Sequence, residues 1–321
     1  MLSDFRSHCL SAAFLGERPA FALADGTVRR PGAEVERIPV HAASSLAAAP
    51  VAGDALLTSG EDGRVCRIDA SGAAREVGAV PRKWITSIGE SRGRLAWASG
   101  KTVWLHGADG APARQLAHPR GVKGIAFSRD GSRLAVVQQD AVSVHDTEAA
   151  GAPLELAWND IHLASTFSPD GRFLVIASQN CFLHGWRLAD RKHFRMLGYP
   201  GRVADWAWDA TGALLATSGA SAAIVWPFDG GDGPMTRSAV EVGARAGRTV
   251  TAVAWQPATR RLAIGYDDGR VQLASVDDPQ AARTVREGGR AAITAIAWNG
   301  DGTDLAFGSA TGECGAMAVD A

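Results

Sequence analysis

The fold is decided by the stretch Gly124-Ile125-Ala126-Phe127-Ser128-Arg129-Asp130-Gly131-Ser132-Arg133-Leu134, in which a turn sequence joins two apolar segments. Leu134 follows Phe127 by seven places. The same spacing recurs at Ile88/Leu95, Phe167/Leu174, Trp208/Leu215, Trp255/Leu262 and Trp298/Leu305. The bulky first members of these pairs are 39, 40, 41, 47 and 43 residues apart along the chain. A period near 40 residues, built of short apolar segments and turns, indicates a stacked or circular repeat array.

Each repeat is expected to form four short β-strands. In the fourth repeat these strands are predicted at 122–127, 133–138, 141–145 and 153–158. All four are too short for a typical helix, and they contain many Val, Ile, Phe and Trp residues. Asp, Gly, Asn and Ser at the junctions favour hairpin turns.

Eight repeats can be counted, and the first two are less regular than the others. In the first repeat, strands are predicted at 9–15 and 20–24, and the turn between them is shortened. In the second repeat, Ala49 replaces the bulky residue that precedes the turn, and strands are predicted at 56–60 and 64–69.

The repeats resemble those of the WD40 family, whose pattern runs Gly-His, then Phe-Ser-Pro-Asp-Gly, then Trp-Asp. Here the order is Ala117-His118, then Phe127-Ser128-Arg129-Asp130-Gly131, then His145-Asp146, and Phe167-Ser168-Pro169-Asp170-Gly171 reproduces the middle element. The final dipeptide is degenerate in other repeats, as at Ile68-Asp69, Trp186-Arg187, Trp226-Pro227 and Val276-Asp277. The resemblance extends over almost the whole chain.

This resemblance implies an all-β fold, a WD40-like β-propeller in which each repeat forms a four-stranded blade, as a single domain over residues 1–321. It also implies closure by a strand from the other end of the chain. The eighth repeat has only three predicted strands, at 293–298, 304–308 and 313–319, and residues 2–6 are available to supply the fourth. We predict eight blades. The alternative is seven, if the first or second repeat is not a full blade.

Several recurring residues have a structural explanation. We interpret the bulky anchors as packing residues and not as a binding box, because they recur in register where blades pack face to face: Phe127, Phe167, Trp208, Trp255 and Trp298. The resemblance places His41 and His118 at the family's structural His position, and Asp62, Asp140 and Asp268 at its Asp position. In the family such pairs are hydrogen-bonded and brace the blade.

Composition excludes several classes of protein. A hydrophobic fraction of 46% in 321 residues excludes wholesale disorder, and a net charge of −1 argues against sequence-independent nucleic-acid binding. Four cysteines without a C-x-x-C pair favour a reducing compartment. No apolar run reaches the roughly 18 residues of a membrane helix, and Glu17-Arg18 interrupts the N-terminal run that a secretory signal would need. We therefore expect a monomeric cytoplasmic protein that binds neither nucleic acid nor membranes. High Ala and Arg with little Lys suggests a GC-rich bacterial source.

The sequence contains no catalytic, metal or cofactor signature. Ser99-Gly100-Lys101-Thr102 ends like a phosphate-binding loop, but Leu95 occupies the required Gly position and a strand follows instead of a helix. Cys181 and His184 have a spacing seen in metal sites, yet residues three apart on a strand point to opposite faces. We predict a hairpin at the first motif, and no catalytic residue, metal or cofactor anywhere.

One distribution of residues indicates binding. Basic residues recur in the loop that leads into the innermost strand of a repeat, which we call the inbound loop: Arg82 with Lys83, Arg120, Arg202, Arg248 and Arg290. Aromatic residues occupy the same loops at Trp84, Trp158 and Tyr199. A propeller brings all inbound loops to one face, and Arg with aromatic residues is the composition of interface hot spots. Alternatively, these cations are solvated or paired with acids on the same face: Glu61, Asp62, Asp140, Asp160, Asp267 and Asp268.

These observations favour a non-catalytic scaffold that binds a partner protein through the Arg- and aromatic-rich face. An acidic or phosphorylated segment is the natural ligand for clustered Arg, because a guanidinium meets carboxylate or phosphate in two parallel hydrogen bonds. The alternatives are a propeller-fold enzyme or cofactor-bearing protein, such as a hydrolase or quinoprotein, and a metal-homeostasis accessory protein. The Ala- and Val-rich inner strands offer an enzyme few catalytic groups.

Overall fold

The computed structural model describes residues 2–108 and 113–319. Within these ranges all regular secondary structure is β-strand, and the strands form eight sheets of four strands each. The prediction of eight four-stranded blades is therefore confirmed, and the alternative of seven is wrong. The described residues include no helix that is long and apolar enough to cross a membrane. The chain divides into two compact units, Met1–Ile38 with Gly198–Ala321, and Pro39–Leu197.

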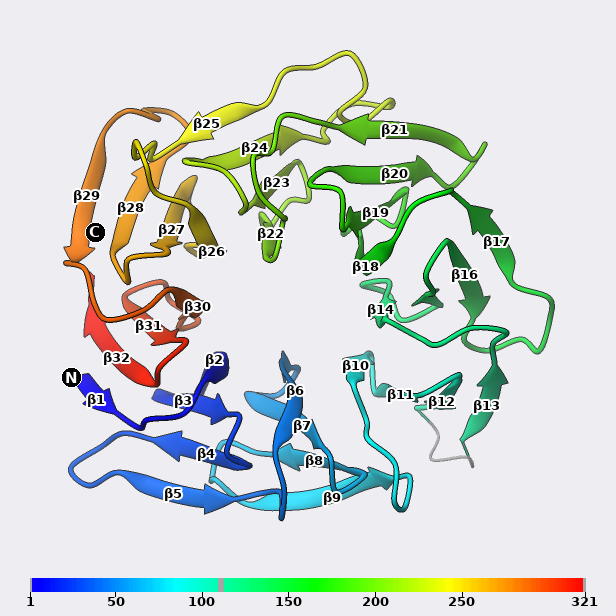
Figure 1. Ribbon diagram of the computed structural model, residues 1–321, viewed down its shortest axis with the longest axis horizontal. Helices are drawn as coiled ribbons and strands as arrows, with labels where there is room; N and C mark the ends of the chain where they lie inside the picture. Colours follow the sequence, from blue (N-terminus) through cyan, green and yellow to red (C-terminus); the bar gives the residue numbers. More distant parts are fainter. Residues whose placement is uncertain (1, 109–112, 320–321) are drawn as a thin grey trace. The chain divides into compact units, whose positions relative to one another are not determined.

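The first unit contains the blades nearest both ends of the sequence (Figure 1). Each blade is an antiparallel sheet with its strands in chain order, except that the first strand of the chain joins the last blade. The strands are β1 (Leu2–Asp4), β2 (Cys9–Leu15), β3 (Arg18–Leu23), β4 (Thr27–Arg30), β5 (Glu36–Pro39), β22 (Trp206–Trp208), β23 (Leu214–Thr217), β24 (Ala223–Pro227), β25 (Val240–Val242), β26 (Val250–Trp255), β27 (Arg261–Tyr266), β28 (Val271–Ser275), β29 (Ala282–Arg286), β30 (Ile293–Trp298), β31 (Asp304–Ser309) and β32 (Glu313–Ala318).

The second unit contains four blades that follow one another along the chain, and their inner strands β6, β10, β14 and β18 contact each other in succession. The strands are β6 (Ser45–Val51), β7 (Ala55–Gly60), β8 (Arg64–Ile68), β9 (Ala74–Ala79), β10 (Ser87–Ser91), β11 (Arg94–Ser99), β12 (Thr102–His106), β13 (Arg114–Ala117), β14 (Gly124–Phe127), β15 (Arg133–Val137), β16 (Ala141–Asp146), β17 (Leu154–Ala157), β18 (His162–Phe167), β19 (Phe173–Ser178), β20 (Leu183–Arg187) and β21 (Lys192–Met196). The predicted hairpin at Gly100-Lys101 joins β11 to β12 and is confirmed.

The turn in the deciding stretch is held by its own side chains. The Ser128 hydroxyl donates to Asp130 Oδ1 at 2.6 Å and accepts a hydrogen bond from the Arg133 amide at 2.9 Å. Gly131 lies at φ +73°, a conformation that costs little only for glycine. These local bonds explain why the Ser-x-Asp-Gly signal marks the β14–β15 hairpin so reliably.

The N-terminal strand closes the last blade, as predicted. β1 pairs antiparallel with β32, with Ser3 opposite Cys314, so the sheet order is β1-β32-β31-β30. The strand ends at Asp4 and not at Arg6. Arg6 therefore lies outside the sheet, in the inbound loop of β2.

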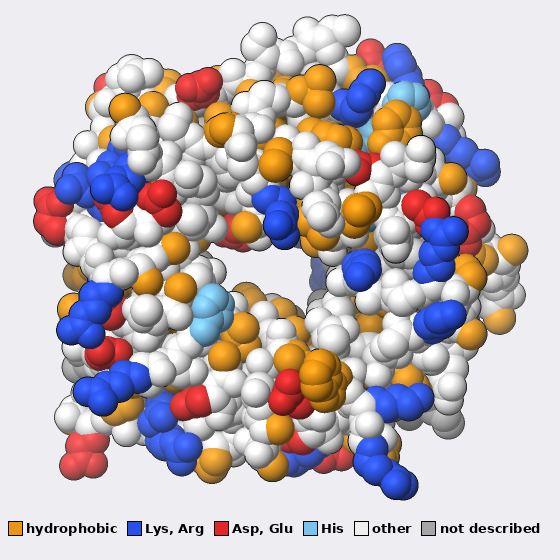
Figure 2. All heavy atoms as spheres, viewed as in Figure 1, with side chains coloured by type: hydrophobic (Ala, Val, Ile, Leu, Met, Phe, Trp, Pro, Cys, Tyr) orange, Lys and Arg blue, Asp and Glu red, His pale blue; other side chains and the backbone are white. Residues whose placement is uncertain are grey.

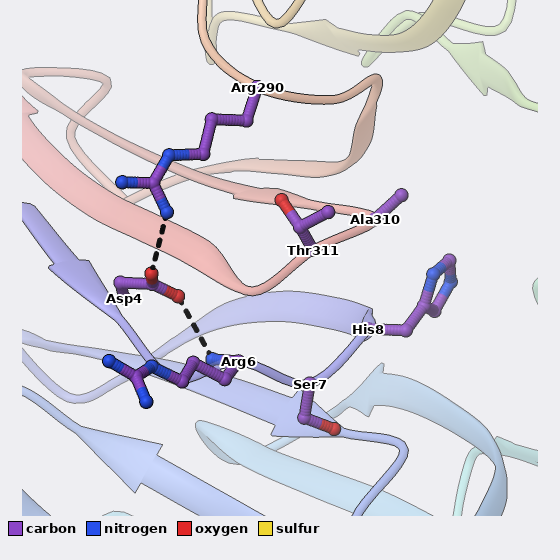
Figure 3. Close-up of a pocket in the computed structure, with 7 residues that line it drawn as sticks. All are labelled: Asp4, Arg6, Ser7, His8, Arg290, Ala310 and Thr311. Atoms are coloured by element: carbon purple, nitrogen blue, oxygen red, sulfur yellow. Dashed lines mark hydrogen bonds and ion pairs between the residues drawn. The ribbon is translucent and has the colours of Figure 1, made fainter.

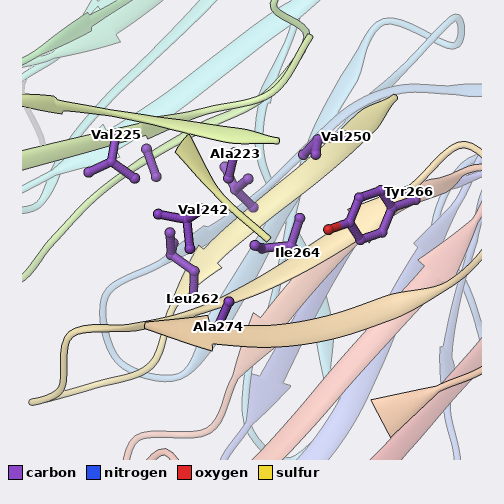
Figure 4. Close-up of a cluster of buried hydrophobic side chains, with 10 residues drawn as sticks. Ala223, Val225, Val242, Val250, Leu262, Ile264, Tyr266 and Ala274 are labelled. Atoms are coloured by element: carbon purple, nitrogen blue, oxygen red, sulfur yellow. The ribbon is translucent and has the colours of Figure 1, made fainter. Parts of the chain in front are cut away.

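The cores lie between neighbouring blades. In the first unit, a cluster between the sheets β22–β25 and β26–β29 includes Val225, Val242, Leu262, Ile264 and Tyr266 (Figure 4). The anchors pack as predicted, and two of them also bond to the preceding blade: the indole nitrogen of Trp255 donates to the Ala207 carbonyl at 3.0 Å, and that of Trp298 to the Ala254 carbonyl at 3.3 Å.

Candidate functional site

The predicted binding residues are divided between the two units. Arg82, Lys83, Trp84, Arg120 and Trp158 belong to the second unit. The first unit contains Tyr199, Arg202, Arg248 and Arg290. Their side chains differ sharply in exposure and in partners, so each loop is described by itself.

The inbound loop of β10 presents its side chains to solvent. Arg82, Lys83 and Trp84 are all exposed, and Trp84 exposes 61% of its surface. Within the described residues, neither Arg82 nor Lys83 has an ion pair. This loop therefore offers an indole and two unneutralised cations on consecutive residues.

The backbone of this loop is pinned on both sides of Trp84. The Val80 amide donates to the Gly63 carbonyl at 2.7 Å, and the Ile85 amide to the Gly60 carbonyl at 3.3 Å. A side-chain carbon on Gly63 would lie 2.3 Å from the Val80 carbonyl oxygen, so only glycine permits this approach. The loop is thus preorganised, which lowers the entropic cost of binding.

Arg120, in the inbound loop of β14, is neutralised by an ion pair with Asp140. The predicted hydrogen bond between His118 and Asp140 is not formed, because Arg120 takes the Asp140 carboxylate. The Nε2 atom of His118 is buried without a partner, and its ring meets that of His145 edge-on at 5.3 Å. Burial lowers the pKa of His118, because a charged ring would lose its hydration.

The other predicted His–Asp pair is present in the second blade. His41 Nδ1 lies 3.0 Å from Asp62 Oδ1, and His41 Nε2 lies 2.9 Å from the Thr58 hydroxyl. Burial lowers the pKa of His41, and the Asp62 carboxylate offsets part of that shift. These bonds connect the inbound loop of β6 to the β7–β8 hairpin.

Trp158 is half-buried and already stacked. Its ring lies 4.1 Å from that of His184, and the Arg195 guanidinium lies 5.7 Å from its centre. Burial is the main cause that lowers the pKa of His184, to about 3. Trp158 therefore packs against the last blade of this unit and keeps part of its surface exposed.

Acids neutralise two of the predicted arginines of the first unit. The Arg248 guanidinium lies 3.5 Å from the Asp268 carboxylate, which also binds the Arg245 guanidinium at 3.0 Å. Asp268 is therefore paired with two arginines and not with a histidine. Arg290 lies 3.2 Å from Asp4. On the face shown in Figure 2, the basic side chains of this unit alternate with acidic ones.

Arg202 and Tyr199 share one inbound loop but differ in environment. Arg202 is exposed and has no ion pair among the described residues. Tyr199 is buried, and its hydroxyl is bonded to the Thr217 hydroxyl at 2.7 Å and to the Trp226 indole at 2.6 Å. Burial raises the pKa of Tyr199 to about 12. Tyr199 is thus part of the packing of its blade and not an exposed aromatic contact.

The structure also brings together residues that sequence reasoning missed. A cavity of about 510 Å³ next to Arg290 is lined by Asp4, Arg6, Ser7, His8, Ala310 and Thr311 (Figure 3). Arg6 was expected to end the closing strand, which hid its place in an inbound loop. Its position three residues before β2 is the signal that could have revealed it.

Within residues 2–108 and 113–319, no group of three or more His, Cys, Asp or Glu side chains is arranged to hold a metal ion. The four cysteines are free thiols, and three of them are buried.

Comparisons with known proteins agree with this architecture. The sequence model of the anaphase-promoting complex subunit 4 WD40 domain matches residues 236–288. A crystal structure of the computationally designed Ika8 protein is 15% identical and has a TM-score of 0.79, covering 99% of this chain and 98% of that one. A chain in the crystal structure of the Mitotic Checkpoint Complex is 17% identical, with a TM-score of 0.65 over 83% of this chain and 88% of that one. No curated protein matches the sequence.

The structural similarities establish the fold alone, and the sequence match to the WD40 model is confined to residues 236–288. That match covers β25 and the blade β26–β29, including the turn in which Asp268 holds Arg245 and Arg248. Together with the repeat spacing and the eight four-stranded blades, it supports the resemblance of the chain to WD40-repeat β-propellers.

Proposed function

We propose that this protein is an interaction scaffold whose partner protein docks on the inbound loop of β10, with Trp84 at the centre of the contact. The observation that carries this proposal is the 61% exposure of the Trp84 side chain. The backbone of its loop is held by hydrogen bonds, and the two preceding cations have no ion pair in the described part of the chain. An exposed Trp on a rigid loop is costly to leave in water and gains most when a partner covers it.

The positive charge of this loop indicates the charge of the surface that it would bind. Arg82 and Lys83 directly precede Trp84, so a partner segment with acidic or phosphorylated side chains would complement them. The indole supplies buried area and the cations orient the segment. Arg120 is a weaker candidate, because binding through it would first have to break its ion pair with Asp140.

The comparisons support proteins as the class of partner. A chain of similar fold is found in a crystal structure of the Mitotic Checkpoint Complex. This similarity concerns the fold, and the choice of the β10 loop as the contact surface rests on Trp84 and its neighbours alone.

The test compares three variants of the full chain as bait in lysate of the source organism, with quantitative mass spectrometry of the captured proteins. Trp84→Ala removes the indole, Arg82→Gln with Lys83→Gln removes the two cations, and Arg120→Gln is the matched control. A captured candidate is then purified and titrated. We expect Trp84→Ala to weaken its binding by at least about 30-fold, the cost of losing a hot-spot side chain.

The double Gln variant should weaken binding by about tenfold and reduce its salt dependence. Arg120→Gln should leave affinity nearly unchanged, since its charge is already neutralised. If Trp84→Ala binds the same partners as tightly as wild type, the β10 loop is not the docking site. Unchanged melting temperatures in all three variants would exclude misfolding as the cause of any loss.

A further inference from the structure

The cavity beside Arg290 is formed by three separate segments of the first unit. The connection between β1 and β2 supplies one wall, the loop between β29 and β30 supplies a second, and the turn between β31 and β32 supplies the third (Figure 3). Its polar groups are the side chains of Asp4, Arg6, Ser7, His8, Arg290 and Thr311.

The backbone around the cavity is fixed by close contact. The Phe5 amide donates to the Gly312 carbonyl at 2.9 Å. A side-chain carbon on Gly312 would lie 2.5 Å from the Ser7 nitrogen and 2.7 Å from the Arg6 nitrogen. Arg6 itself lies at φ +55°, which is uncommon for a residue other than glycine. The walls are therefore in place before any ligand arrives.

One carboxylate of the protein, that of Asp4, already accepts hydrogen bonds from two of the donors at this cavity. The Asp4 carboxylate accepts a hydrogen bond from Arg290 Nη1 at 3.2 Å and from the Arg6 amide at 3.0 Å (Figure 3). A guanidinium and a backbone amide thus converge on one carboxylate from two different segments. Such a pair of donors is the usual environment of a bound oxyanion.

Further donors remain after Asp4 is satisfied. The Arg6 guanidinium has no ion pair among the described residues. The Ser7 hydroxyl accepts the Asp25 amide at 3.0 Å, which leaves its own hydrogen available to donate. The hydroxyl of Thr311 and the exposed ring of His8 complete the set.

The charges at the cavity leave a surplus of one cation. Arg290 lies 3.2 Å from Asp4 and 4.0 Å from Glu313, and Glu313 is also bound by Arg286 at 3.3 Å, so three arginines, counting Arg6, face two acids. Arg6 has no acid of its own among the described residues.

We propose that this cavity binds the phosphoryl group of a phosphate monoester. A phosphoryl group presents three terminal oxygens and up to two negative charges, so it can accept from Arg6, Arg290 and a hydroxyl at the same time. A carboxylate has only two oxygens with which to accept hydrogen bonds and carries one negative charge. The site lies in the first unit, so it stands or falls independently of the Trp84 surface.

The experiment is calorimetric titration of the full chain at fixed ionic strength with two probes, inorganic phosphate and a phosphoserine peptide. The unphosphorylated peptide and its Ser→Glu form are the ligand controls. Arg6→Gln and Arg290→Gln should each weaken binding by at least about tenfold, as expected for the loss of a charge-assisted hydrogen bond. Arg248→Gln, which alters a paired arginine of the same unit, should have no effect.

Asp4→Asn provides a test in the opposite direction. It retains an acceptor for the Arg6 amide but removes the competing negative charge, so phosphoryl binding should become several-fold tighter. Tighter binding of the phosphopeptide than of phosphate identifies a phosphorylated protein as the source of the group, whereas equal affinities identify a small phosphate ester. The proposal is overturned if neither probe binds saturably, or if Arg6→Gln and Arg290→Gln bind as wild type does.

Discussion

The position of the Trp84 loop depends on one residue 21 places earlier in the chain. Gly63 lies at φ +77°, and its missing side chain is what allows the Val80 and Lys83 carbonyls to approach. Gly100 lies at a similar φ of +60° but has nothing within 4 Å of the place where a side chain would be added. A side chain added at Gly100 would meet only the cost of its backbone conformation, whereas one added at Gly63 would also collide with neighbouring backbone. Comparing the two positions therefore separates these two costs.

We predict that Gly100→Ala costs about 1 kcal/mol of unfolding free energy, the penalty of a left-handed conformation for a residue with a side chain. Gly63→Ala should cost at least about 2 kcal/mol more, because the added carbon collides with backbone that is itself hydrogen-bonded. Urea unfolding of both variants measures the difference. Equal costs would show that the loop can move aside, and that the preorganisation argued for Trp84 is absent.

At the scale of the blade, the second and fourth blades differ in the residue that can hydrogen-bond to the histidine at the equivalent position, His41 or His118. In the second blade, the Thr58 hydroxyl pairs with His41 Nε2 at 2.9 Å. Thr58 lies four residues before Asp62, and the residue four before Asp140 is Val136. His118 therefore has no hydroxyl to meet, and its Nε2 atom is buried without a partner.

Exchanging these residues should exchange the behaviour of the two blades. Val136→Thr gives His118 a partner and should raise the unfolding free energy by about 0.5–1.5 kcal/mol. Thr58→Val leaves His41 Nε2 unpaired and should lower it by about 1–3 kcal/mol. Chemical denaturation of the two single variants checks both signs. Destabilisation by Val136→Thr would mean that the hydroxyl does not reach His118.

The blades themselves could be predicted from sequence because each is specified locally. The apolar anchor, the Ser128-to-Gly131 type of turn and the Leu seven residues on are all close in the chain, and the turn closes with its own side chains. The same is true of β2 and β30, whose predicted bounds, 9–15 and 293–298, are those observed.

The charges of the proposed binding face could be predicted only in part, because they depend on contacts distant in sequence. Arg290 is neutralised by Asp4, 286 residues away, and Arg248 by acids of a neighbouring turn. No spacing rule shows which arginine finds an acid and which, like Arg82 or Arg202, stays free of ion pairs in the described structure. The burial of Tyr199 could not be predicted for a similar reason: its hydrogen-bond partners, Thr217 and Trp226, lie in later strands.

Over the whole molecule, groups of opposite pH response are segregated between the two units. Every histidine except His8 lies in the second unit. Five of these have pKa values lowered mainly by burial, and the value is about 4 for His145 and about 3 for His184: His41, His118, His145, His162 and His184. In the first unit, burial raises the pKa of Asp205 to about 6, although its carboxylate accepts the Val253 amide at 2.8 Å.

Acidification from pH 7 to pH 5 should therefore loosen the second unit and spare the first. Between pH 6.5 and 4 a histidine with a lowered pKa binds its proton only when unfolded, so His145 and His184 should each remove about 2 kcal/mol of stability by pH 5. Asp205 acts in the opposite sense, because below pH 6 the folded state binds its proton first, which adds about 1 kcal/mol of stability.

Hydrogen exchange at the two pH values, corrected for the intrinsic rate, should show lost protection in β14–β20 and little loss in β22–β27. In His184→Phe, which keeps the stack on Trp158 but does not titrate, the loss should shrink by about 2 kcal/mol. Equal loss of protection in both units would contradict the segregation of these groups as the cause.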